Sequence, residues 1–167
     1  MLSDLIKNFI FDAAAHIFPL LAKKIYPQSK YVEHIRISAG STTPLIFSLS
    51  GGNSCPEASI WLKITNLSPY LDTEIKQVEI TLLVAGTSII KRYRLPFYDI
   101  IPHSSEKEVY ILQQLNYFQV ETLKKFKKKP EAKATIQVEL TLSSSLYTVR
   151  KLEILQNVHY EIEGYDG

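Results

Sequence analysis

The sequence has little of several features that would direct an interpretation. Only one of its 167 residues is cysteine, Cys55, so no disulfide can form within the chain, which fits a reducing compartment. The net charge of +2 is too small to indicate nucleic-acid binding by itself. The length fits one domain with a terminal extension. We therefore expect a cytoplasmic globular protein without nucleic acid as a partner.

Motifs that carry chemistry are also missing. The four histidines have no metal-ligand spacing, and Gly51-Gly52 lacks the spacing and the following helix of a phosphate-binding loop. Cys55 lies in a Gly/Ser/Pro loop, but the histidines that could activate it are remote in sequence. We expect no metal, no cofactor, no small-molecule substrate and no enzymatic activity.

Alternating apolar residues predict a mainly β protein. The clearest runs are 58–65 and 78–84, separated by a turn that contains Asn66 and Pro69. Further strands are expected at 32–37, 45–49, 89–95, 109–111, 136–142, 146–154 and 158–162. These strands are short and lack a β-α-β rhythm, which favours an antiparallel two-sheet sandwich, fibronectin-like or immunoglobulin-like, over residues 30–163.

Other residues qualify this pattern. Pro96 and Pro102 are expected to bound an irregular segment. Charged residues between the apolar ones, such as Glu79, are typical of a solvated sheet face. The run 91–94 interleaves Lys and Arg with Tyr, which suits RNA binding and equally suits the outer face of an edge strand.

One short helix is expected to interrupt the strands. One face of it is formed by Leu115, Phe118, Thr122, Leu123 and Phe126, and Pro130 ends it. Lysines crowd its last turn, where they complement the helix dipole: Lys124, Lys125, Lys127, Lys128 and Lys129. This lysine cluster is a candidate contact for an anionic surface; the alternative is a solvated helix end.

Residues 1–27 are predicted to form an amphipathic helical extension that is interrupted at Pro19. The face selected as a candidate contact for a partner or a membrane consists of Leu2, Ile6, Phe9, Ile10, Ala13 and Ile17. Charged residues such as Asp4 and Asp12 argue against a signal peptide or a membrane span. The face is expected to pack on the sandwich, to mediate self-association, or to lie on a membrane surface.

Several segments carry a family resemblance. Ile64-Thr-Asn66-Leu-Ser-Pro69-Tyr70 is a turn after a strand, 78–95 is a hairpin, 101–111 is a polar turn followed by an apolar strand, and 115–129 is a helix. In this order the region of about 57–155 resembles the late-embryogenesis-abundant group 2 domain, also called the water-stress and hypersensitive-response domain. The resemblance implies a fibronectin-III-like sandwich, a link to stress tolerance and no enzymatic activity.

Together these observations predict a non-enzymatic, stress-associated β-sandwich interaction module. Its N-terminal helix is expected to contact a protein partner, another copy of the chain or, peripherally, a membrane. The alternative is a structural or assembly subunit, of a virion or a secretion machine, that self-associates through the sandwich and the N-terminal arm. Both hypotheses depend on where the apolar residues of the segment 2–25 lie.

Overall fold

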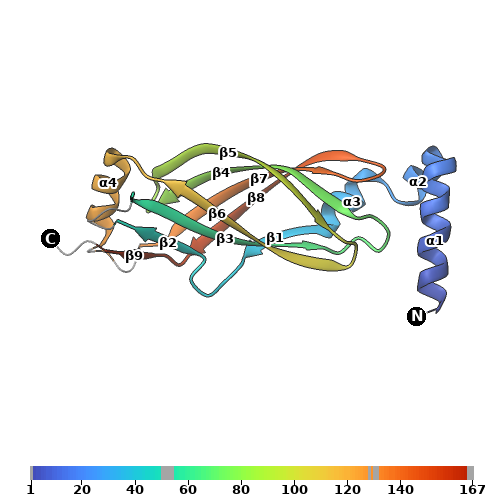
Figure 1. Cartoon of the computed structure of the whole chain (residues 1–167), viewed down its shortest axis with the longest axis horizontal. Helices are drawn as coiled ribbons and strands as arrows, with labels where there is room; N and C mark the ends of the chain where they lie inside the picture. Colours follow the sequence, from blue (N-terminus) through green and yellow to red (C-terminus); the bar gives the residue numbers. More distant parts are fainter. Residues whose placement is uncertain (1, 50–54, 128, 130–131, 165–167) are drawn as a thin grey trace.

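The computed structural model describes residues 2–49, 55–127, 129 and 132–164. Within α1 it describes the side chains of residues 7, 9–11 and 13–17. The described chain forms, in order, α1 (Leu2–Ile17), α2 (Pro19–Ile25), α3 (Gln28–His34), β1 (Ile35–Ala39), β2 (Leu45–Ser48), β3 (Glu57–Asn66), β4 (Thr73–Val84), β5 (Thr87–Ile101), β6 (Ser105–Gln114), α4 (Tyr117–Lys127), β7 (Ala134–Ser143), β8 (Thr148–Val158) and β9 (Glu161–Glu163) (Figure 1).

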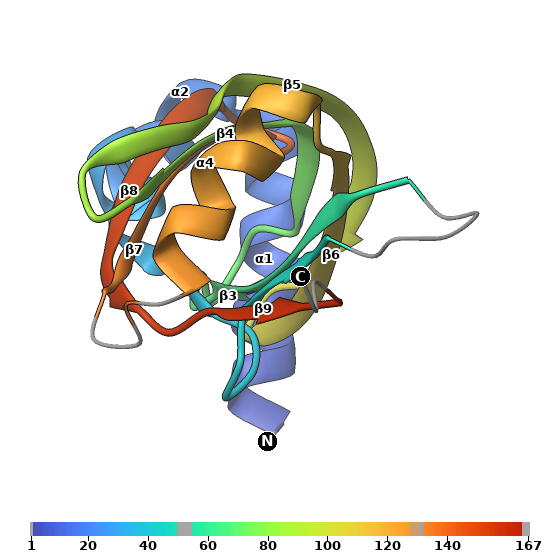
Figure 2. The same ribbon diagram turned by 90° about the vertical axis from the view of Figure 1, so that its left-hand side faces the viewer.

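Two sheets face each other across the core. In the first, β3 pairs with β6 on one side and with β1 and β2 on the other, and β9 joins β2 in parallel. In the second, the order is β5-β4-β7-β8 and all neighbours are antiparallel. Figure 2, seen along the length of the molecule, shows how the sheets enclose the interior. The predicted mainly β, antiparallel two-sheet sandwich is confirmed.

The core follows from the two-residue period of the strands. Successive side chains of a strand point to opposite faces, so every second apolar residue turns inward. On β7 the inward residues Ala134, Ile136, Val138, Leu140 and Leu142 are fully buried, and the residues between them are half-buried. Strand β3 contributes Ile60, Leu62 and Ile64 from the facing sheet.

Two predicted segments differ in the structure. Val32 and His34, predicted in a strand, lie in α3, a helix that follows Pro27 and buries Tyr31; the strand begins at Ile35. Pro96, predicted to end a strand, lies inside β5. A proline is tolerated there because β5 is an edge strand and the ladder shifts register beside this position.

Helices cover the two ends of the sandwich. At one end α4 turns Val120 and Leu123 inward, whereas Phe118, predicted on the same face, is 79% exposed. Phe118 lies two residues before Val120, about 200° away around the helix, so it turns outward when Val120 faces the sandwich. A reciprocal capping box between Asn116 and Gln119 starts the helix. At the opposite end, α1 runs crosswise to the long axis of the sandwich (Figures 1 and 2).

Candidate interaction surface at the helical end

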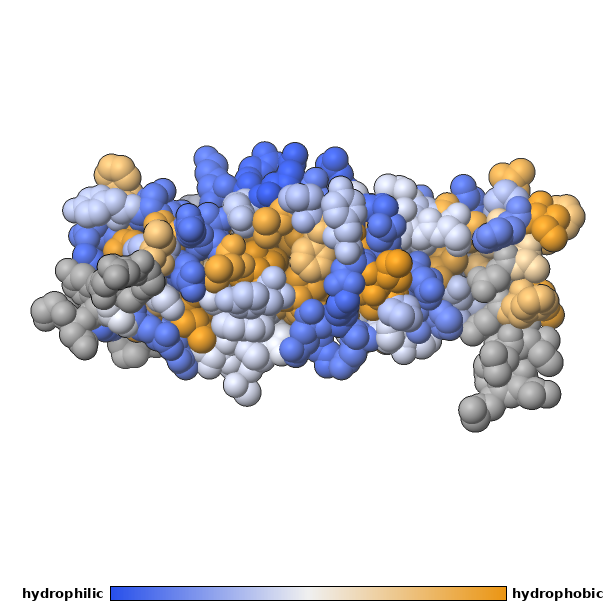
Figure 3. Space-filling model, in the orientation of Figure 1, coloured by the Kyte–Doolittle hydropathy of each residue, from blue (hydrophilic) through white to orange (hydrophobic). Residues whose placement is uncertain are grey.

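The outer surface of α1, α2 and the link between them carries many large apolar side chains, and Lys7, Lys23 and Lys24 are exposed on the same helices. Seven large side chains are more than half exposed, from 52% for Leu21 to 83% for Leu20. They are Phe9, Ile10, Ile17, Phe18, Leu20, Leu21 and Ile25, and we call this surface the apolar end. Figure 3 shows orange side chains gathered at this end of the molecule. Contiguous apolar surface of this kind marks interaction sites in monomeric proteins.

The apolar end exists because α1 has apolar residues on more than one side. Phe11 and Ala15, one turn apart, are buried against the rest of the protein. Phe9, Ile10 and Ile17, from the predicted contact face, point outward instead. Ala13 is half-buried, and the side chains of Leu2 and Ile6 lie outside the described residues. The helix therefore both packs on the protein and presents an apolar face, using different residues for each.

The second helix repeats this arrangement. Pro19 opens α2, as proline does well at a helix start, and Ala22 is fully buried. Leu20, Leu21 and Ile25 are exposed beside the exposed Lys23 and Lys24. Sequence reasoning did not select these leucines; the proline immediately before two leucines and two lysines is the signal that could have indicated them.

Five aromatic residues attach the helices to the sandwich, and we call them the aromatic clamp: Phe11, Tyr26, Tyr31, Tyr70 and Tyr147. The ring of Phe11 stacks on Tyr70 with 4.4 Å between centroids, and Tyr26 meets both rings edge-on. The Tyr147 hydroxyl donates a 2.6 Å hydrogen bond to the Tyr26 carbonyl oxygen. Because the clamp joins α1 and α2 to the β3–β4 and β7–β8 connections, it positions the apolar end.

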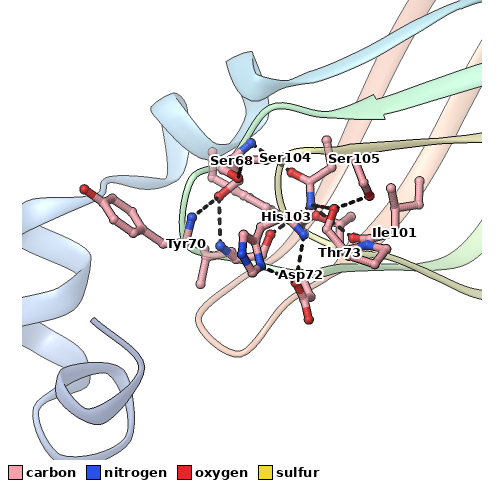
Figure 4. A network of polar contacts seen from close by, with 12 residues as sticks. Ser68, Tyr70, Asp72, Thr73, Ile101, His103, Ser104 and Ser105 are labelled. Carbon is pink, nitrogen blue, oxygen red and sulfur yellow. Dashed lines mark hydrogen bonds and ion pairs between the residues drawn. The ribbon is translucent and has the colours of Figure 1, made fainter. Parts of the chain in front are cut away.

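Beside Tyr70 lies a polar corner that consists of Asn66, Ser68, Asp72, His103 and Ser104. Ser68 Oγ accepts a hydrogen bond from the Tyr70 backbone N–H at 3.3 Å, and Figure 4 shows Ser68, Asp72, His103 and Ser104 close together. Fully buried Asn66 donates through Nδ2 to the carbonyl oxygens of Leu71 (2.8 Å) and Ile101 (3.1 Å). Its Oδ1 accepts the Ser68 backbone N–H at 3.0 Å, an Asx-turn contact. The Ser104 N–H donates to the Ser68 carbonyl oxygen at 3.1 Å, which ties the β5–β6 turn to the corner. The predicted turn at Asn66 is thus a buried junction of two loops.

Burial shifts the pKa of two tyrosines at this end, and contact with His103 shifts the pKa of Asp72. Burial raises the pKa of Tyr26 and Tyr31, so their hydroxyls stay protonated near neutral pH. Partial burial alone would raise the pKa of Asp72, but hydrogen bonds from the backbone N–H and ring of His103, both 2.8 Å, outweigh it and lower that pKa. These groups serve structure; none of them is an activated nucleophile.

The lysine cluster lies at the other end of the molecule. Exposed Lys125, Lys127 and Lys129 lie at the end of α4, and Lys124 pairs with Glu121 at 2.5 Å between Nζ and Oε1. Lys128 lies outside the described residues. The lysine cluster and the N-terminal helix could contact one membrane together only if both lay on one side of the molecule. The structure separates them along its long axis (Figure 1).

Glu79 corrects the interpretation of the outer sheet face as solvated. Its side chain lies under Arg92 and Arg94 of the neighbouring strand, and the residue is only 8% exposed. The hydrogen bonds from Arg94 (2.7 Å) and Arg92 (3.1 Å) lower the pKa of Glu79. The basic residues of the run 91–94 thus serve partly to fix β5 on β4.

A groove and an exposed thiol lie on the described surface. The groove, of about 430 Å³, lies between the β1–β2 loop and the end of β8, and His159 is the only ionisable residue that lines it. Cys55 is exposed. Among the described residues no three His, Cys, Asp or Glu side chains converge as metal ligands. None of the helices, in the part of the chain that was searched, is long and apolar enough to span a membrane.

Comparison with known proteins identifies the fold but no family. No family model and no curated protein matches the chain. A protein from Arabidopsis thaliana, solved in solution, has a TM-score of 0.52 and 16% identity, covering 75% of this chain and 84% of its own. A protein provisionally described as late embryogenesis abundant has a TM-score of 0.44 and 12% identity, covering 89% and 88%. A protein from Archaeoglobus fulgidus has a TM-score of 0.45 and 10% identity, covering 73% and 90%.

Likeness at these identities concerns the fold alone. The Arabidopsis thaliana protein, with a TM-score of 0.52, therefore supports a shared fold and nothing further. The relation to the group 2 domain itself stays a prediction from the sequence.

Proposed function

We propose that the protein is a non-enzymatic interaction module that acts through its apolar end. The observation that carries the proposal is the seven exposed apolar side chains, held on the sandwich by the aromatic clamp. Exposed apolar side chains cost solubility, and a site built on firmly positioned elements binds with less loss of conformational freedom. A stress-associated role is what the resemblance to the group 2 domain implies.

The edges of the sheets are poor sites for self-association. Asp99 of β5 and Lys107 of β6 form an ion pair on the core-facing side of two edge strands. Lys151 and Glu153 do the same on β8, with 3.6 Å between Nζ and Oε2. Inward charges on edge strands oppose pairing with another sheet. An assembly subunit, the alternative function, would therefore associate through the apolar end.

Site-specific photo-crosslinking in the native host tests the proposal. A photoreactive amino acid replaces Leu20 in the apolar end or, as the matched control, Leu152, which is 51% exposed on β8. We expect cross-links to protein or lipid at position 20 and few at position 152. Equal and sparse products at the two positions would contradict an interaction role for the apolar end.

A further inference from the structure

We propose that the occupant of the apolar end is the surface of an anionic lipid membrane, on which α1 and α2 lie flat while the sandwich projects away from the bilayer. This inference rests on the proposed function and names the partner of the same surface. Three independent features carry it: the shape of the end, its charge, and the length of its helices.

The shape of the apolar end suits a plane. α1 lies crosswise at the tip of an elongated molecule, with α2 beside it (Figure 1). The residues that face the protein are Phe11, Ala15 and Ala22, whereas Phe9 and Leu20 are 76% and 83% exposed. Orange side chains gather at this extreme of the molecule, away from the sandwich (Figure 3). A flat surface can therefore reach the apolar end without meeting either sheet.

The charge of the apolar end selects an anionic surface over a second copy. Residues 13–32 contain three exposed lysines, Lys23, Lys24 and Lys30, and no Asp or Glu. The Lys23 ammonium lies 5.7 Å from the centroid of the Tyr147 ring. Lys7 is exposed on α1, whose sequence also contains Asp4 and Asp12. In a two-fold dimer through this surface the lysines of one copy would approach those of the other. Lysine is also depleted in protein–protein interfaces. Next to anionic headgroups the same lysines are attracted, while the apolar side chains enter the boundary with the acyl chains.

The length of the helices sets the mode of contact. α1 has 16 residues. At about 1.5 Å per residue it measures about 24 Å, less than the roughly 30 Å of a hydrocarbon core. A short helix with an apolar outer face and flanking lysines lies in the interface plane. Because the lysines act through their charge at the membrane surface, we expect a preference for negative charge and not for one lipid.

The test measures binding of the full chain to vesicles of phosphatidylcholine, with and without phosphatidylserine, by flotation. The apolar variant is L20S/L21S and the charge variant is K7E/K24E. The matched controls are L152S/I154S, on exposed β8 residues, and K125E/K129E, in the lysine cluster. Urea unfolding of each variant establishes that it is folded before binding is compared.

We expect binding to phosphatidylserine vesicles that weakens with salt. L20S/L21S should reduce it by at least about tenfold through lost apolar burial. K7E/K24E should reduce it by at least about 25-fold, at about fivefold for each lysine removed from an anionic surface. Both controls should bind within about twofold of the native chain. Absence of binding by the native chain, or loss of binding in K125E/K129E with K7E/K24E unaffected, would overturn the membrane proposal.

Light scattering distinguishes the membrane proposal from the proposal that the apolar end is an interaction site. If the native chain ignores vesicles but forms a dimer that L20S/L21S converts to a monomer, the occupant is a second copy. That result overturns the membrane proposal and retains the apolar end as the interaction site. If the chain neither binds vesicles nor self-associates, and position 20 gives no cross-links, both proposals fail.

Discussion

The two ends of the sandwich are both covered by helices, yet they differ in what those helices leave outside. In α4 the apolar residues Val120 and Leu123 face the sandwich, Tyr117 and Phe118 are exposed in its first turn, and lysines are exposed near its end. In α1 and α2, Phe11 and Ala22 face the protein, and among the side chains that the structure describes there, more large apolar ones are exposed than buried. An ordinary amphipathic helix needs only one apolar stripe, so the second stripe is the signal of interaction.

The ends also differ in how they are fixed. At the α4 end, Asn116 and Gln119 exchange hydrogen bonds of 2.7 and 3.0 Å at the helix start, and Gln119 Nε2 donates to the carbonyl oxygen of Ile89 on β5 at 2.6 Å. The apolar end depends on the aromatic clamp and on the polar corner, whose Asn66 is fully buried. We therefore expect substitutions at the α1–α2 end to have larger effects than equivalent ones at the α4 end.

The largest expected effect is that of Asn66→Ala. It leaves the buried carbonyl oxygens of Leu71 and Ile101 and the Ser68 N–H without the amide that they contact. We expect a loss of about 3 kcal/mol in the free energy of unfolding, since buried polar groups would remain unsatisfied. Urea denaturation measures it. The comparison variant Asn116→Ala removes an exposed cap and should lower the free energy of unfolding by about 1 kcal/mol. Equal losses in the two variants would show that the buried amide of Asn66 stabilises the protein no more than an exposed helix cap does.

The next largest effect is expected for Phe11→Ala, which distinguishes the buried face of α1 from its exposed face. It removes the stack on Tyr70 and should weaken docking of the helix by about 2 kcal/mol, less than in a large core because α1 can open locally. Amide exchange in α1 should therefore accelerate about thirtyfold, while exchange in β4 and β7 stays unchanged. The matched control is Phe9→Ala, at a residue that is 76% exposed. An equal acceleration in the control would contradict the assignment of the buried stripe.

The strands were predictable because their signal is local. Alternation from Ile136 to Leu142 requires only that one face of the strand be buried, and the same period recurs in β3 and β4. Pro96 was misinterpreted because whether a strand lies at an edge, where proline is tolerated, depends on the order of strands in the sheet. That order is a property of the whole chain.

The candidate site was predictable only in part. Phe9, Ala13 and Ile17 form a regular helical stripe, and so do Phe11 and Ala15. Periodicity cannot rank them, because the choice depends on Tyr70, a residue far along the chain. The lysine cluster was correctly placed at the end of a helix, but its distance from α1 follows from the topology. Local patterns thus identified the helices, and the tertiary contacts decided which face of each is free.

The smallest expected effect concerns the pH dependence of stability at the α1–α2 end, through Asp72. The folded-state pKa of Asp72 lies below its ordinary value of 3.8 because of its hydrogen bonds from His103. A lowered carboxyl pKa adds stability above pH 3.8, and this contribution is lost as the pH falls through the folded-state pKa. Asp72→Asn should therefore lower the urea midpoint slightly at neutral pH, and the difference from the native chain should shrink on acidification. Because Asp72 is mostly exposed, the effect should be small. A difference that is the same at neutral and acidic pH would assign the role of Asp72 to its shape and not to its charge.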